Sequence, residues 1–191
     1  LLEGLAGVDQ LLEAGKPLPA FDWHCPLLSL PLAFATRLDT IPEPGPYLRA
    51  RPERTEHWAQ RLGPKTRPRV GIAWSGNATH GNDRNRSIAL ADLLAGLPPP
   101  SVCEYVSLQK QVRSSDSAAL RQGSTRHFGS ELEDFADTAG LCANLDLVLS
   151  VDTSVAHLAG ALGKETWILL PRVPDWRWLL GRADSPWYPG V

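Results

Sequence analysis

The chain has 191 residues, of which 43% are hydrophobic and 21% charged, and its formal net charge is −2. These values are close to the averages of soluble globular domains, so they exclude the disordered and fibrous classes and allow one full domain with part of another. Acidic and basic residues are interleaved, which excludes the basic surface that binding to nucleic acid or an anionic membrane requires.

The first 45 residues carry only short, interrupted patterns. Residues 1–6 have a helical pattern and residues 8–12 a strand pattern, and a loop rich in Gly and Pro follows. Residues 41–46 contain three prolines, which fix φ and lack an N–H donor, so no helix or central strand can pass through them. We interpret residues 1–45 as the remnant of one domain and residues 46–66 as a linker with a helix.

From residue 67 to residue 191, predicted strands and helices alternate. The run Val70 to Trp74 is apolar and bounded by turn-forming residues, which is typical of a strand buried on both faces. Ser130 to Glu133 has the S-x-x-E form of a capping box, and Gly163 is placed to end a helix. Further strands are predicted at 103–108, 125–128, 145–150 and 166–170, and helices at 54–62, 89–97, 115–121, 130–144 and 154–162. This alternation predicts an α/β fold with a doubly wound parallel sheet.

The cysteines and the apolar stretches indicate the compartment. Cys25, Cys103 and Cys142 are too widely spaced for a disulfide framework or a zinc site, which favours a reducing cytoplasm. No apolar stretch approaches the roughly 20 residues that cross a bilayer, and no signal-peptide pattern opens the chain. The chain contains no Met and begins Leu1-Leu2, so we expect it to be a fragment that lacks its natural start.

The loop after the strand at 70–74 is long and polar. It runs from residue 75 to residue 87 and consists mainly of small, amide and basic side chains. Gly76 and Gly81 permit backbone geometries closed to other residues, and Arg84 and Arg86 carry planar guanidinium groups that suit phosphate oxygens. The loop therefore predicts either a polyanion site or a solvated surface loop.

A second loop, residues 150–154, leads from a buried strand directly into a helix. The backbone N–H groups of Thr153, Ser154 and Val155 have no helical partners at that point, and the helix dipole adds roughly half a positive charge. An anion is therefore favoured there.

Asp152 and His157 flank this helix start. We expect Asp152 either to cap the helix or to accept hydrogen bonds from hydroxyl groups. His157 lies three residues after Ser154 on the same helix face, so it either supports a phosphate or is packed and hydrogen-bonded in the core. The Trp-rich tail after residue 171 offers rings that either stack on a base or sugar or pack the chain terminus against the domain.

Other motifs are missing. The chain has no G-x-S-x-G elbow, no G-x-G-x-x-G and no G-x-x-x-x-G-K-[ST], which argues against hydrolase, dinucleotide and P-loop sites.

The segment 152–164, DTSVAHLAGALGK, is similar to the D-T-x-x-x-H-L-A-x-A-L-G-[KR]-P signature of the glycosyltransferase family 9 heptosyltransferases. Segments 74–77, 82–87, 107–110 and 174–178 resemble glycosyltransferase-like modules that often follow tetratricopeptide repeats in bacterial proteins. The resemblance implies a GT-B architecture of two Rossmann-like domains. Residues 67–191 would be the complete C-terminal domain, which binds the nucleotide sugar, and residues 1–45 part of the N-terminal, acceptor-side domain.

The resemblance also implies a set of site residues. Those expected to bind the donor diphosphate and ribose are Gly76, Asn77, Arg86, Asp152, Thr153, Ser154, Val155 and His157, and the candidates on the nucleoside side are Gln109 and Lys110. The donor is expected to be linked to ADP or UDP, with no metal and no cofactor. Glu165 replaces the proline of the signature. The acidic base of the family comes from the start of the N-terminal domain, so no catalytic residue is assigned here.

The function expected from the resemblance is inverting, metal-independent transfer of a sugar to a hydroxyl of a glycan, lipid or protein acceptor. The alternative is a non-catalytic nucleotide-binding or protein-interaction module of GT-B type attached to tetratricopeptide repeats. Nucleic acid is not expected as a partner. The expected location is the cytoplasm, and a lipid acceptor would bring the protein to the cytoplasmic face of the inner membrane as a peripheral protein.

Overall fold

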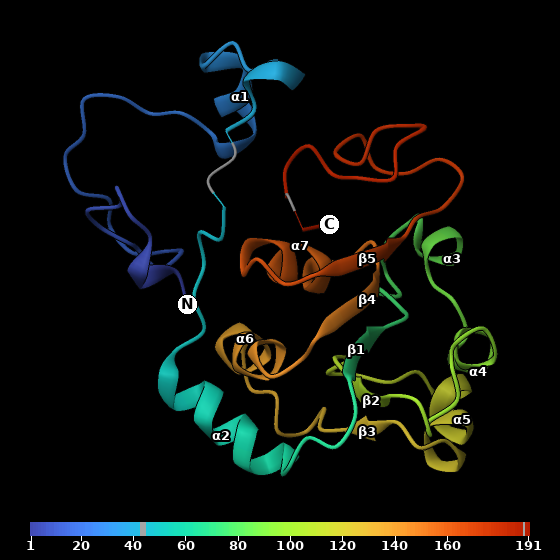
Figure 1. Cartoon of the computed structure of the whole chain (residues 1–191). Helices are drawn as coiled ribbons and strands as arrows, with labels where there is room; N and C mark the ends of the chain where they lie inside the picture. The colour runs from blue at the N-terminus through green and yellow to red at the C-terminus, as the bar shows by residue number, and fades with distance from the viewer. Residues whose placement is uncertain (43–44, 189) are drawn as a thin grey trace.

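A five-stranded parallel sheet forms the centre of the computed structural model, which describes residues 1–42, 45–188 and 190–191 (Figure 1). The strand order is β3-β2-β1-β4-β5, and every pairing is parallel. The strands are β1 (Arg69–Ala73), β2 (Glu104–Ser107), β3 (Arg126–His127), β4 (Leu147–Val151) and β5 (Thr166–Leu169). This confirms the predicted α/β fold with a Rossmann-like, doubly wound sheet.

Helices cover both faces of the sheet (Figure 1). On one face lie α2 (Pro52–Leu62), α6 (Phe135–Ala143) and α7 (Ser154–Ala161), and on the other lie α4 (Leu90–Ala95) and α5 (Ser117–Gln122). Val148 packs in the first apolar cluster and Leu149 in the second, because successive residues of a strand point to opposite faces. Burial on both faces explains why β4 has a nearly continuous apolar sequence.

The helix predicted at residues 130–144 begins later than expected. Ser130 and Glu131 lie in a turn, and α6 begins at residue 135 with Asp134 as its N-cap. The Asp134 carboxylate accepts the backbone N–H groups of Ala136 at 2.7 Å and Asp137 at 3.0 Å. The capping-box prediction was therefore wrong, because Asp134 is an equally suitable cap and directly precedes the buried helix.

The end of α7 follows the prediction. Gly163 has a φ of 67° and follows the C-cap, the position where a left-handed residue is needed. The N–H of Lys164 donates to the carbonyl of Ala159, and the N–H of Gly163 donates to that of Gly160, both at 3.0 Å. These two bonds form a Schellman motif, which satisfies carbonyl groups at the end of the helix.

Residues 1–42 form turns instead of a sheet. They contain 3-10 turns at Leu2–Gly4, Leu27–Ser29 and Leu38–Thr40 and the single-turn helix α1 (Leu30–Ala33). The strand predicted at 8–12 does not form within this described segment, where no residue is buried. An isolated strand would gain neither backbone partners nor apolar contacts. The assignment of residues 1–45 to a separate domain stays a prediction, and residues 43–44 of the proline-rich segment 41–46 lie outside the described residues.

Across the part of the chain that the structure describes, no helix has both the length and the apolar character needed to cross a membrane.

Candidate functional site

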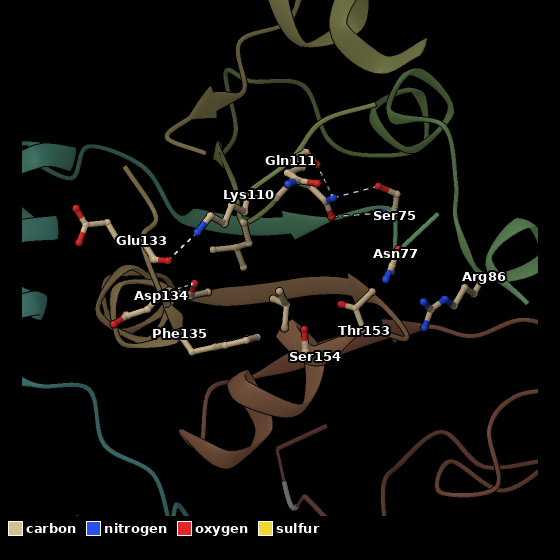
Figure 2. A pocket seen from close by; sticks show the side chains of 15 residues that line it. Ser75, Asn77, Arg86, Lys110, Gln111, Glu133, Asp134, Phe135, Thr153 and Ser154 are labelled. Carbon is tan, nitrogen blue, oxygen red and sulfur yellow. Dashed lines mark hydrogen bonds between the residues drawn. The ribbon is translucent and has the colours of Figure 1, made fainter. Parts of the chain in front are cut away.

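A cavity of about 440 Å³ opens at the edge of the sheet where the parallel strands end. We call it the β1–β4 cavity because its walls include the loops that follow these two strands (Figure 2). The strand order reverses between β1 and β4, and ligands of open α/β sheets bind at such reversals. Its volume falls within the range of small-molecule sites. The predicted site residues that line it are Gly76, Asn77, Arg86, Gln109, Lys110, Thr153, Ser154 and Val155.

Arg86 is held beside the start of α7. It ends a short helix, α3 (Asp83–Arg86), within the long polar loop that follows β1. Its Nη1 donates to the backbone carbonyl of Asp152 at 2.9 Å, and Figure 2 shows the guanidinium beside Thr153. Its Nε is buried and has no hydrogen-bond partner among the described residues. This nitrogen lies 3.7 Å from Oδ1 of Asp83, so the guanidinium that lines the cavity is held on two sides.

Gly76 makes room for that guanidinium. A Cβ at this position would lie 2.5 Å from Nη2 and 2.7 Å from Cζ of Arg86. Neither Gly76 nor Gly81 has a positive φ. We had expected both to adopt a backbone geometry closed to other residues, and they do not. The requirement for glycine at residue 76 is one of space.

The loop between β1 and α4 is ordered by a buried carboxylate. Asp83 accepts a hydrogen bond from the Ser87 hydroxyl at 2.9 Å and forms an ion pair with Arg113. Burial would raise the pKa of Asp83, but these two hydrogen bonds and the charges of Arg113 and Arg86 outweigh burial and lower it. The Ser87 hydroxyl also accepts the Gly76 N–H at 3.1 Å. The loop that contains Arg86 is thus held in place by these hydrogen bonds and by the ion pair.

The N-terminus of α7 provides a second source of positive potential. Thr153 is the N-cap but makes no side-chain cap bond, and the first turn holds no acidic residue. Thr153, Ser154 and Val155 all line the cavity. The positive end of the helix dipole therefore faces the same space as Arg86.

Asp152 does not cap α7, so the first of its two predicted roles is wrong, whereas the second, as an acceptor for hydroxyl groups, stays a prediction. Its carboxylate accepts the indole N–H of Trp178 at 3.0 Å, and its side chain does not line the β1–β4 cavity. Oδ1 of Asp152 thus bonds to a residue 26 positions further along the chain instead of to the start of its own helix. Asp152 acts on the cavity only through its carbonyl, which holds Arg86.

His157 also lies outside the lining of the β1–β4 cavity. Its ring stacks on Trp178 with 5.1 Å between centroids, and its Nδ1 lies 3.1 Å from the Tyr188 hydroxyl. Burial lowers the pKa of His157, opposed by the charge of Asp152, whose Oδ1 is 3.9 Å from Nε2. The structure shows His157 packed and hydrogen-bonded although its side chain is still 34% exposed, and its predicted role beside a phosphate stays a prediction.

Gln109 and Lys110 connect the loops around the cavity. The Gln109 amide donates to the Ser75 hydroxyl at 3.0 Å, which joins the loops after β1 and β2. The Lys110 ammonium donates to the backbone carbonyl of Glu133 at 2.7 Å, and Figure 2 shows this bond spanning the rim. Their role as nucleoside contacts stays a prediction.

The start of α6 supplies lining residues that the sequence reasoning missed, namely Glu133, Asp134 and Phe135. Hydrogen bonds from the backbone N–H groups of Asp137 and Ala136 lower the pKa of Asp134, so this carboxylate stays ionised. The sequence analysis missed these three residues because the S-x-x-E motif placed the start of the helix at residue 130. An acidic residue directly before a buried helix, at the carboxyl edge of the sheet, was the usable signal. No cluster of three or more His, Cys, Asp or Glu suited to a metal occurs in the described part of the chain.

Comparison with known proteins gives one distant relative. Protein FlbA of Caulobacter vibrioides is 28% identical over 165 residues, which cover 80% of this chain. The same match covers 26% of FlbA, so the chain spans about a quarter of the length of this relative. No protein-family model matches the chain. No solved structure matches it. The chain is therefore a Rossmann-like α/β domain distantly related to FlbA.

Proposed function

We propose that the β1–β4 cavity binds a sugar nucleotide through its diphosphate and that the chain is the donor-binding part of a glycosyltransferase of GT-B type. One observation carries the proposal. Arg86 and the uncapped N-terminus of α7 meet in a single cavity at the reversal of strand order. Both favour an anion with several oxygens.

The diphosphate would lie between Arg86 and the first turn of α7. Nη1 of Arg86 is already anchored on the Asp152 carbonyl, so the guanidinium is oriented before the ligand arrives. The N–H groups of Thr153, Ser154 and Val155 approach from the other element. Because negative charge grows on the diphosphate as the sugar leaves, donors placed in advance would stabilise the transition state more than the ground state.

The nucleoside would extend along the other rim, towards the start of α6. Glu133 and Asp134 line this part of the cavity, and carboxylates there can accept hydrogen bonds from ribose hydroxyls. Phe135 and Leu108 add apolar contact surface. Lys110 fixes the position of the Glu133 backbone and so the width of this end.

In the proposed reaction, an acceptor hydroxyl oxygen bonds to the anomeric carbon while the bond from that carbon to the diphosphate oxygen breaks, with inversion. The hydroxyl proton passes to a base that we assign to no residue of this chain. Arg86 and the α7 dipole supply positive charge for the leaving diphosphate, and the mechanism assigns no metal to this step.

Calorimetric titration with ADP, UDP and GDP tests the donor site. At least one diphosphate should bind, more tightly than its free nucleoside. Arg86→Ala should weaken that binding by about tenfold or more, since a charge-assisted hydrogen bond contributes roughly 1.5–3 kcal/mol. Arg84 is the matched control, because it belongs to the same helix but is exposed and absent from the cavity lining. Failure of all three diphosphates to bind, or equal effects of Arg84→Ala and Arg86→Ala, would exclude the donor site.

A second measurement separates transfer from binding alone. The sugar nucleotide that matches the preferred diphosphate is mixed with candidate acceptors, and release of the diphosphate is followed. Tight binding without release would favour the alternative, a nucleotide-binding module that performs no catalysis.

A further inference from the structure

A second cavity lies beside α7, between the N-terminal segment and the C-terminal tail. Its volume is about 610 Å³, and we call it the aromatic cavity. Four aromatic side chains line it: Tyr47, Trp176, Trp187 and Tyr188. His157, Arg177 and the tyrosine hydroxyl groups supply the polar atoms of its wall. Leu27 and Leu28 of the N-terminal segment line the other side, where both stay more than 80% exposed.

The wall formed by the tail is held firmly on α7. Gly160 leaves space for Tyr188, because a Cβ on this glycine would lie 2.7 Å from Cγ of the tyrosine ring. The Tyr188 hydroxyl lies 3.1 Å from Nδ1 of His157, and the nearby Trp178 is buried. This wall of the cavity is thus formed before any ligand binds.

Not every ring in this region is used for packing. Trp176 remains 58% exposed, although it meets Trp187 edge to face with 6.1 Å between centroids. Cζ of Arg177 lies 4.9 Å from the centre of the Trp176 ring. Large exposed rings in a concave site offer flat faces to a ligand.

The charges of the polar wall are balanced. Nη1 of Arg177 is paired with Asp175 at 2.7 Å. Burial lowers the pKa of His157, so its ring is neutral at neutral pH. An anion would therefore find no unpaired cation among these groups, whereas hydroxyl groups would find both donors and acceptors.

We propose that the aromatic cavity binds a neutral saccharide, with a sugar ring stacked on Trp176 and its hydroxyl groups bonded to Arg177 and Tyr47. A sugar ring has an apolar C–H face and a polar rim, which matches aromatic faces bordered by hydrogen-bonding groups. Binding of a saccharide here does not require that the β1–β4 cavity binds a nucleotide.

The position of the cavity points to the acceptor. A groove along α7 shares His157 and Tyr47 with the aromatic cavity, and it shares Ser154 and Phe135 with the β1–β4 cavity. His157, which lines the aromatic cavity, therefore lies about one helical turn along α7 from Ser154, which lines the β1–β4 cavity. The assignment as acceptor, unlike the saccharide site, rests on the proposed function.

A microarray of neutral and acidic glycans, followed by saturation-transfer NMR with the best neutral glycan, tests the site. We expect neutral glycans to bind and Trp176→Ala to weaken binding by about fivefold or more. Trp167→Ala is the matched control, because Trp167 is 59% exposed but lies on β5, outside the aromatic cavity. It should leave binding unchanged.

Three outcomes would overturn the saccharide site. They are no glycan binding, binding restricted to acidic glycans, and equal binding by Trp176→Ala and the unmodified chain. If the apolar dye anilinonaphthalene sulfonate binds in a Trp176-dependent manner and no glycan does, the cavity serves an apolar ligand instead. Titration of the same samples with nucleoside diphosphates distinguishes the two sites. Trp176→Ala should retain diphosphate binding, and Arg86→Ala should retain glycan binding.

Discussion

The carboxylate of Asp152 accepts the indole N–H of Trp178 at 3.0 Å, while the backbone carbonyl of the same aspartate accepts Nη1 of Arg86 at 2.9 Å. Asp152 therefore links the C-terminal tail to the wall of the β1–β4 cavity. A substitution in the tail should therefore change ligand binding in the β1–β4 cavity, because it acts through the backbone of Asp152 on Arg86.

Trp178→Phe tests this link. The variant keeps an aromatic ring against His157 but removes the donor to the Asp152 carboxylate. We expect the free energy of unfolding in urea to fall by about 1.5–3 kcal/mol, the usual contribution of a hydrogen bond to a charged group. Diphosphate binding should also weaken. The control Trp167→Phe changes an exposed ring and should alter stability by less than about 0.5 kcal/mol. Equal stability of the two variants would show that the Asp152–Trp178 bond contributes nothing.

Gly76→Ala tests the space requirement beside Arg86. The added methyl group would come within 2.5 Å of the guanidinium and should displace it, which would lower diphosphate affinity by about tenfold. Gly81→Ala is the control in the same loop, because a Cβ there has no atom within 4 Å. If displacement of Arg86 is the cause, Gly76→Ala should have no further effect in a chain that already carries Arg86→Ala. Additive losses would point to a different role for Gly76.

Glu104 carries the third prediction, because it joins two arginines at the amino-terminal edge of the sheet. It bonds to Arg69, which is only 4% exposed, at 2.8 Å and to Arg126 at 2.6 Å. Glu104→Gln leaves a buried guanidinium without its counter-charge and should lower the free energy of unfolding by about 3–5 kcal/mol. Glu131→Gln is the control, since its ion pair with Arg61 is exposed and should contribute little to stability.

The same carboxylate predicts the response to acid. Burial would raise the pKa of Glu104, but the hydrogen bonds and charges of Arg126 and Arg69 lower it below its usual 4.5. Its stabilising contribution is therefore complete above pH 4.5 and is lost as the pH falls through the lower pKa of the folded state. Urea unfolding at a series of pH values should show this loss, and Glu104→Gln should have a shallower acid limb. Parallel curves for the two proteins would contradict it.

His157 should make stability depend on pH in a milder range. Burial lowers its pKa below the usual 6.5, so the unfolded chain takes up the proton first as the pH falls. The free energy of unfolding should thus decline below pH 6.5 towards the lower pKa of the folded state. His157→Gln should remove part of this decline. The part due to His127, whose pKa burial also lowers, should remain.

The sheet could be inferred from the sequence because it depends on local pattern. Apolar runs such as Val148 to Val151 suit burial on both faces, and the intervening helical segments require parallel crossovers. The prediction of an anion at Thr153 to Val155 was also local, since it follows from the start of a helix after a buried strand. The same local reasoning failed for residues 8–12, where a strand pattern has no neighbour to pair with.

The roles of single polar side chains depended on partners that are distant along the chain. Asp152 bonds to Trp178 instead of capping its own helix, and His157 meets Tyr188, 31 residues away. Asp134 reached the cavity because the chain after β3 places the start of α6 at the edge of the sheet. Whether a segment forms a helix or a strand depends mainly on its own backbone hydrogen bonding and apolar pattern. The partner of a polar side chain, in contrast, is whichever donor or acceptor the folded chain brings within reach. The strands and the start of α7 could therefore be predicted from the sequence, whereas the β1–β4 cavity and the aromatic cavity required the packed chain.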